Sequence, residues 1–186
     1  LPEIREFERT STATLNAYLQ PLISSYVARL DKGLTSDGFN GELLIVQSNG
    51  GLMSVDTTTT YPVRTALSGP AAGVRAAQAI AGAAGITDII TCDLGGTSFD
   101  VSLISKGRTT LAAQTEVEFG LVIRTPMIEI TTIGAGGGSI ARIDAGGLLQ
   151  VGPESAGSDP GPVCYGLGNQ KPTLTDANLV LGRINP

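Results

Sequence analysis

A turn of two glycines between two apolar runs constrains this chain more than any other feature of its sequence. Residues 89–104 read Ile-Ile-Thr-Cys-Asp-Leu-Gly-Gly-Thr-Ser-Phe-Asp-Val-Ser-Leu-Ile, so Gly95 and Gly96 separate two segments of strand-forming residues. Short glycine-containing connections join antiparallel strands. We therefore expect a two-stranded antiparallel hairpin over 89–104, with its Gly95-Gly96 turn exposed beside a cavity.

The chemistry of this turn suits an anion. The paired glycines lack side chains and tolerate positive φ, so successive backbone N–H groups can converge on a phosphate. Thr97 and Ser98 add hydroxyl donors, and Asp93 and Asp100 flank the turn. These carboxylates would repel phosphate unless a cation lay between them, and Mg²⁺, which binds one or two carboxylates together with waters and phosphate oxygens, resolves that conflict. The alternative is an ordinary hairpin with a polar turn.

Helical periodicity dominates the first part of the chain. Apolar residues recur at helical spacing over 3–30. Because proline suits a first turn but not a helix interior, Pro21 predicts two helices, with a break near Gln20 and a stop at Gly33. The apolar run 43–46 predicts a buried strand that leads into a turn at 49–51. Further on, Ser68-Gly69-Pro70 can start a helix of small residues that ends within 82–85, with Ser68 near its cap.

Strand signals dominate the remainder. Besides the hairpin, we expect strands at 111–119, 127–133, 140–143 and 148–151, and a long ordered loop at 152–168. Thr175 can cap a last helix that runs through Leu181. The change from helical to strand character near Gly85 indicates a lobe boundary, and the fold class is α/β.

Composition excludes several classes of function. Twelve basic and 17 acidic residues give a net charge of −5, so no basic stripe exists for nucleic acids or anionic membranes. The chain contains no histidine, which excludes Ser-His-Asp catalysis within it, and Cys92 and Cys164 lack the spacing of a zinc site. The N-terminal residues show no secretion signal, and no apolar run approaches the roughly 20 residues of a membrane span, so a cytoplasmic location is expected.

Three further segments carry candidate site residues. The glycine loop of Gly136, Gly137, Gly138 and Ser139 could cradle a second anion or contact the nucleotide sugar, or it could be a simple hairpin with close packing. Residues 47–51 end a strand, where α/β folds often place ligand contacts. Asp176 is a third carboxylate for proton transfer beside Asp93 and Asp100, or a first-turn acid of the last helix.

The string from Asp93 to Asp100 resembles the phosphate-binding hairpin of the actin, sugar-kinase and heat-shock-chaperone ATPase superfamily. In that superfamily a small-residue helix precedes the second phosphate hairpin, as residues 68–73 do here. Several stretches in order are similar to the hydantoinase A and 5-oxoprolinase family, and they span nearly the whole chain: 8–12, 47–51, 68–73, 134–140, 152–157, 160–166 and 175–182.

The resemblance implies a partial actin-like (ribonuclease H-like) ATPase fold. Residues 1–84 would be the end of the first lobe, with a crossing helix at 70–84, and 85–186 the start of the second lobe, with the phosphate hairpin at 89–104. Family members carry an earlier Asp-x-Gly-Gly-Thr hairpin on the other lobe, whereas this sequence contains one such hairpin. We therefore expect an internal fragment of a longer subunit that lacks part of the first lobe and is inactive alone.

The resemblance also implies a reaction. The parent enzyme would use ATP to phosphorylate an amide or lactam oxygen of a small cyclic amide before water opens the ring, together with a second hydantoinase B-type subunit or domain. In that scheme residues 95–98 bind phosphate oxygens, Asp93 holds Mg²⁺ and a water, and Asp100 supports the metal shell. The alternatives are a ketone carboxylase subunit and a non-catalytic nucleotide switch.

Overall fold

The computed structural model describes residues 4–117 and 120–185, and the chain forms two compact units. The first unit comprises 1–89 and 102–129, and the second comprises 90–101 and 130–186. The chain passes from one unit to the other within the two strands of the predicted hairpin. Helices and strands occur in both units, which agrees with the expected mixed α/β class. The assignment of 1–84 and 85–186 to two ATPase lobes stays a prediction.

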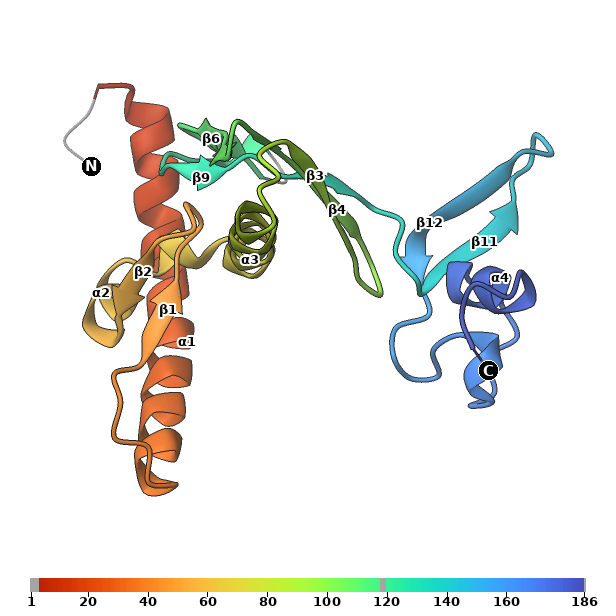
Figure 1. Cartoon of the computed structure of the whole chain (residues 1–186), viewed down its shortest axis with the longest axis horizontal. Helices are drawn as coiled ribbons and strands as arrows, with labels where there is room; N and C mark the ends of the chain where they lie inside the picture. The colour runs from red at the N-terminus through yellow and green to blue at the C-terminus, as the bar shows by residue number, and fades with distance from the viewer. Residues whose placement is uncertain (1–3, 118–119, 186) are drawn as a thin grey trace. The chain divides into compact units, whose positions relative to one another are not determined.

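The first unit is built on one long helix, α1 (Glu6–Ser36), where two helices were expected (Figure 1). The predicted break near Gln20 and the stop at Gly33 are wrong, since α1 continues through both Pro21 and Gly33. Proline inside a helix costs about 3 kcal/mol, and contacts on both sides of it offset that cost. Before the proline, the side-chain amides of Asn16 and Gln20 donate to the carbonyl of Thr60 at 3.1 and 3.2 Å, and beyond it Val27 is buried.

A helix and a 3₁₀ turn pack on α1, and a short hairpin packs on that second helix. Strands β1 (Leu44–Val46) and β2 (Leu52–Ser54) pair antiparallel, which confirms the predicted strand and turn, although β1 is only partly buried. The helix α2 (Val55–Thr60) and the 3₁₀ turn η1 (Pro62–Thr65) follow.

The predicted small-residue helix is α3 (Ser68–Ala83). Its N-cap is Leu67, in a left-handed conformation, and no side chain caps it. Ser68 is therefore the first helical residue and does not supply the cap hydrogen bond. Ala71 has no exposed surface, as expected for a face that lets another backbone approach closely.

The core of the first unit centres on Val63, Ile123 and Met127, with Leu15 and Ala66 packed against them. Two-residue strands supply part of this core: β6 (Leu111–Ala112) pairs with β9 (Met127–Ile128), and β7 (Thr115–Glu116) pairs with β8 (Val122–Ile123). The single strand predicted at 111–119 is therefore wrong, because the chain changes partner after Ala112; residues 118 and 119 lie outside the described part.

The hairpin is present as predicted. Strands β3 (Ile89–Leu94) and β4 (Phe99–Ser105) are hydrogen-bonded neighbours joined by residues 95–98, a connection short enough only for an antiparallel pair. Within the second unit β10 (Thr131–Ile133) pairs antiparallel with β4, and within the first unit β5 (Arg108–Thr109) does so.

The second unit adds a second antiparallel pair and a capped helix. Strand β11 (Ser139–Ile143) pairs with β12 (Leu149–Ser155), and the turn η3 (Val163–Tyr165) and helix α4 (Leu174–Val180) follow. The loop expected at 152–168 thus begins later, because β12 continues through Ser155. Thr173, and not Thr175, caps the last helix. None of the helices in the described ranges has the length and apolar character that a membrane span requires.

Candidate functional site

The hairpin turn presents its backbone openly. The N–H of Gly95 donates to the carbonyl of Ser98 at 2.9 Å and closes the turn. Both glycines avoid the left-handed region of φ, so conformational freedom is not what requires glycine here. A Cβ atom built on Gly96 would meet nothing within 4 Å. The space next to Gly96 is therefore open to a ligand. A larger side chain at position 96 would fill that space and keep a ligand out.

The glycine loop predicted at 136–139 lies directly against this turn. The N–H of Gly137 donates to the carbonyl of Gly95 at 2.8 Å, and that of Gly138 donates to the carbonyl of Gly96 at 2.7 Å. A Cβ atom on Gly136 would lie 2.5 Å from the backbone nitrogen of Thr97. Close packing of backbone on backbone thus explains the glycine at 136, and the loop holds the turn in place.

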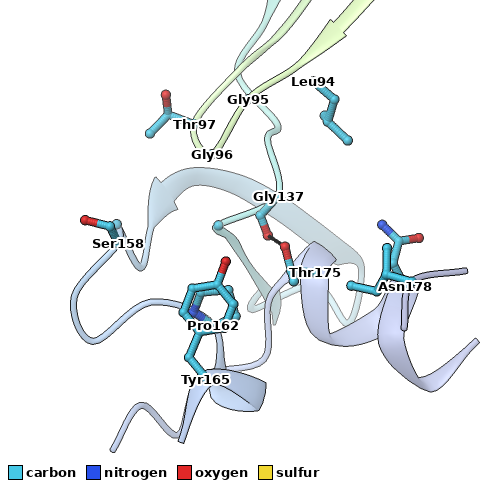
Figure 2. A pocket seen from close by; sticks show the side chains of 13 residues that line it. Leu94, Gly95, Gly96, Thr97, Gly137, Ser158, Pro162, Tyr165, Thr175 and Asn178 are labelled. Carbon is cyan, nitrogen blue, oxygen red and sulfur yellow. Dashed lines mark hydrogen bonds between the residues drawn. The ribbon is translucent and has the colours of Figure 1, made fainter. Parts of the chain in front are cut away.

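The loop is in turn held by the segments that follow it. The backbone N–H and the hydroxyl of Thr175 both donate to the carbonyl of Gly137 at 2.9 Å (Figure 2). The N–H of Ala156 donates to the carbonyl of Gly138 at 2.8 Å, and the hydroxyl of Ser139 accepts from the N–H of Gly136. Three layers of backbone, in the order turn, glycine loop and α4 start, therefore support the predicted phosphate site.

A cavity of about 500 Å³ opens beside the turn, within the second unit (Figure 2). Its size falls in the range of small-molecule sites. Its walls come from the turn, the glycine loop, η3, α4 and residue 184, and none of the described residues that line it is charged. The lining residues are Leu94, Gly95, Gly96, Thr97, Gly137, Gly138, Gly157, Ser158, Pro162, Tyr165, Thr175, Asn178 and Ile184. The turn is thus exposed next to a cavity, as expected.

The two predicted catalytic carboxylates lie beside the turn but do not line this cavity. Asp100 accepts hydrogen bonds from the hydroxyl of Thr132 at 2.6 Å and from that of Ser98 at 3.3 Å. The Ser98 hydroxyl is thereby directed to a carboxylate, whereas Thr97 lines the cavity. Asp93 is exposed on β3. Within the described ranges, no three His, Cys, Asp or Glu side chains gather as a metal site, so a metal here would need ligands from waters and phosphate.

Asp176 is a structural carboxylate, as its place in the first turn of α4 indicated. With Thr173 it forms a capping box, and it also accepts from the N–H groups of Val163 and Cys164 at 3.1 and 2.7 Å. Burial alone would raise the pKa of Asp176, but the hydrogen bonds from Cys164 and Thr173 outweigh it and hold that pKa far below its ordinary value. The link from α4 to η3, which places Tyr165 in the cavity wall, had no signal in the sequence.

The two cysteines and the turn at 47–51 complete the candidate residues. Cys92 and Cys164 are both free thiols. Desolvation and the neighbouring Asp176 raise the pKa of Cys164, which disfavours a thiolate nucleophile. Residues 47–49 line a separate cavity within the first unit.

Comparison with known proteins places this arrangement in a family. The sequence profile described as hydantoinase/oxoprolinase matches residues 9–186. The alpha subunit of caprolactamase from Pseudomonas jessenii is 47% identical over 181 residues, which are 97% of this chain and 26% of that protein. The acetophenone carboxylase gamma subunit of Aromatoleum aromaticum is 41% identical over 185 residues, 99% of this chain and 25% of that protein. The 5-oxoprolinase of Saccharomyces cerevisiae is 39% identical over 186 residues, 100% of this chain and 14% of that protein.

Solved structures agree. A segment of the ATP-dependent caprolactamase from Pseudomonas jessenii superposes with a TM-score of 0.80 and 46% identity, over 100% of this chain and 27% of that one. Nucleotide-free acetone carboxylase gives a TM-score of 0.82 with 31% identity, over 100% of this chain and 26% of that one. The chain spans between 14% and 28% of the length of the curated relatives that it matches.

Proposed function

The chain belongs to the hydantoinase/oxoprolinase family, and from that premise we propose that it is a segment of an ATP-dependent enzyme that opens cyclic amides. Relatives named caprolactamase and 5-oxoprolinase support this assignment. The observation that carries it is the open turn at Gly96, backed by the glycine loop and bordered by the cavity.

Backbone N–H groups of the turn are the proposed phosphate ligands. None of the described residues accepts a hydrogen bond from the N–H of Gly96 or Thr97, so both donors remain available to phosphate oxygens. Fixed backbone donors stabilise developing negative charge without reorganising during the reaction. We assign phosphate binding to the N–H groups of Gly96 and Thr97, whereas Gly95, the other predicted ligand, uses its N–H to close the turn. Ser98 would contribute mainly by orienting Asp100, since its hydroxyl donates to that carboxylate.

A divalent cation fits the donors beside the turn. Asp93 offers an exposed carboxylate, and Asp100 retains lone pairs beyond its two accepted hydrogen bonds. One or two carboxylates completed by waters and phosphate oxygens are the usual environment of protein-bound Mg²⁺. We propose that Asp93 holds Mg²⁺ and that Asp100 supports its shell. The cation would offset the phosphate charge, which no charged side chain of the cavity wall can do.

The reaction follows from the chemistry of an amide. Its carbonyl oxygen attacks the terminal phosphorus of ATP and ADP departs, which leaves an O-phosphorylated intermediate. Water then adds to the activated carbon, and the C–N bond breaks with the nitrogen leaving as a protonated amine, so the ring opens and the carbon is left as an acyl phosphate. A second water hydrolyses the acyl phosphate to a carboxylate and inorganic phosphate. Bound donors at the turn would place the phosphate for this transfer.

The proposed function also implies a fold and further parts of the parent protein. We propose a partial actin-like fold, in which α3 is the crossing helix and β3–β4 the second phosphate hairpin. A first phosphate hairpin elsewhere in the parent chain and a hydantoinase B-type subunit or domain would complete the enzyme. Support comes from relatives that are named as subunits and are several times longer than this chain.

An ATP-dependent ketone carboxylase is the second candidate, because the segment also resembles acetone carboxylase and the acetophenone carboxylase gamma subunit. One assay separates the two. The full-length protein would be incubated with ATP and either 5-oxoproline, caprolactam, a hydantoin or a small ketone with bicarbonate. We expect ADP release coupled to a ring-opened product, lost in Asp93→Asn. ADP release coupled only to ketone carboxylation would overturn the amidase assignment and support the carboxylase.

A further inference from the structure

A second cavity, within the first unit, has the composition of an anion site. It measures about 290 Å³ and lies between the β1–β2 turn and residues 124–126, with Arg64 contributed by η1. Arg64 and Arg124 both line it, and none of the described residues that line it is acidic. Two guanidinium groups at one small cavity bring several N–H donors in planar arrays, which suit the oxygens of an anion.

The walls of this cavity are held by a buried serine. The hydroxyl oxygen of Ser48 lies 2.6 and 2.5 Å from the carbonyl oxygens of Arg64 and Ala66, which share its one proton, and the Ser48 N–H donates to the same Arg64 carbonyl at 2.7 Å. The N–H of Ile128 donates to the Ser48 carbonyl at 2.8 Å. Ser48 therefore fixes the β1–β2 turn against both η1 and β9, so the cavity is formed before a ligand arrives.

The segment that carries Arg124 is also fixed. The N–H of Arg124 donates to the hydroxyl of Thr12 at 2.8 Å, which ties it to α1. The next residue, Thr125, has a buried hydroxyl oxygen with no hydrogen-bond partner among the described residues. A buried polar group without a partner is costly and indicates a missing one. A ligand oxygen in the cavity would supply it.

The guanidinium group of Arg64 is held against the ring of Tyr61, in an orientation that suits hydrogen bonding to an oxyanion. Its guanidinium carbon lies 4.8 Å from the centre of the Tyr61 ring. Stacking of this kind uses the face of the guanidinium, and the N–H donors in its plane remain free to pair with planar or tetrahedral oxyanions. The side-chain oxygen of Asn49 accepts from the N–H of Gly51 at 2.8 Å, which leaves the Asn49 amide N–H groups as further donors.

We propose that this cavity binds the oxyanion group of a small molecule, a carboxylate or a phosphate, through Arg64, Arg124 and Thr125. Guanidinium groups pair with both oxyanions through two parallel charge-assisted hydrogen bonds. The site lies within one unit and uses none of the residues at the β3–β4 turn. It therefore stands independently of the proposed amidase function.

The test is a titration of the 186-residue chain followed by NMR. Inorganic phosphate and acetate would be added separately, at constant ionic strength set with chloride. We expect saturable shifts of the backbone amides of Ser48, Asn49 and Thr125. Arg64→Gln should weaken binding about tenfold, as expected for the loss of one strong charge-assisted contact. Saturation by phosphate alone or by acetate alone identifies the oxyanion and supports the site.

Matched variants separate a specific site from general charge. Arg29→Gln removes the same charge from an exposed position on α1 that lines neither cavity, and its affinity should equal that of wild type. Thr125→Val should weaken binding while preserving shape. Because the Arg64 side chain is exposed, its variant should fold, as circular dichroism would verify. Absence of saturable shifts with both oxyanions, or equal affinities of Arg64→Gln and Arg29→Gln, would overturn the proposal.

Discussion

The N–H of Gly138 donates to the carbonyl oxygen of Gly96 at 2.7 Å, so the glycine loop and the hairpin turn are directly joined through their backbones. The two segments are about 40 positions apart in the sequence. The loop holds the carbonyl groups of Gly95 and Gly96 in place through these hydrogen bonds. A substitution that displaces the loop should therefore displace the turn as well.

Gly136→Ala should damage the turn without touching any ligand. The new Cβ would lie 2.5 Å from the nitrogen of Thr97 and 2.6 Å from that of Ser98, and backbone atoms cannot move aside cheaply. We expect a loss of about 1–3 kcal/mol in the free energy of unfolding, typical of overpacking, measured by denaturant unfolding of the chain. Gly134→Ala is the matched control, since its Cβ meets nothing within 4 Å. Equal stability of the two variants would contradict the close packing.

The β3–β4 hairpin and helix α3 could be predicted from the sequence because residues close together in the chain determine them. The two apolar runs and the paired glycines between them specify the β3–β4 hairpin without help from distant segments. Helix α3 was likewise predicted from neighbouring residues, namely the Ser68-Gly69-Pro70 start and the small residues that follow it. The glycine loop was recognised as a candidate, but its packing against the turn depends on the tertiary fold.

The errors have tertiary causes. Pro21 lies inside α1 because contacts on both sides, including those of Asn16 and Gln20 with Thr60, outweigh its local cost. Strand β6 pairs with β9, and this non-local pairing of two-residue strands leaves little periodicity to detect. The bonds from η3 to Asp176 likewise join segments that only the fold brings together.

Asp176→Asn should destabilise the second unit. The carboxylate accepts from the N–H groups of Val163, Cys164 and Thr173, and an amide cannot accept all three. We expect a loss of about 1–3 kcal/mol at neutral pH, measured by thermal unfolding. Asp31→Asn, on the exposed surface of α1, should leave the midpoint unchanged. An unchanged midpoint in Asp176→Asn as well would show that these bonds contribute little.

The same variant predicts a pH dependence. Because the folded-state pKa of Asp176 is lowered, its stabilisation is fully present above the ordinary carboxyl pKa of about 4 and is lost as the pH falls toward the lowered value. The difference in stability between wild type and Asp176→Asn should therefore shrink progressively below about pH 4. Thermal unfolding of both proteins over a series of acidic buffers measures it. A difference that grows on acidification would contradict the assigned direction of the shift.

Thr132→Val tests the support of Asp100. The Thr132 hydroxyl donates to Asp100 at 2.6 Å and is exposed, so its removal should affect orientation more than stability. In the full-length enzyme we expect turnover to fall about tenfold or more, as for other residues that orient metal-binding groups, with a raised Mg²⁺ requirement. Unchanged turnover at limiting Mg²⁺ would remove Asp100 from the proposed metal shell.

Gly96→Val in the full-length protein tests the phosphate role of the turn most directly. Gly96 does not adopt a left-handed φ and a Cβ there meets nothing within 4 Å, so valine adds little strain and should leave the melting temperature near that of wild type. Its branched side chain would occupy the space assigned to phosphate. Gly33→Val in α1, whose Cβ also meets open space, is the control for a surface valine.

The deciding measurement is ATP-dependent turnover of the two variants beside their melting temperatures. Phosphate binding at the turn predicts that Gly96→Val melts normally and loses ADP release and ring opening together, whereas Gly33→Val retains both. A Gly96→Val protein that melts normally and couples ATP cleavage to ring opening at the wild-type rate would contradict the assignment and leave Gly96 as a structural turn residue.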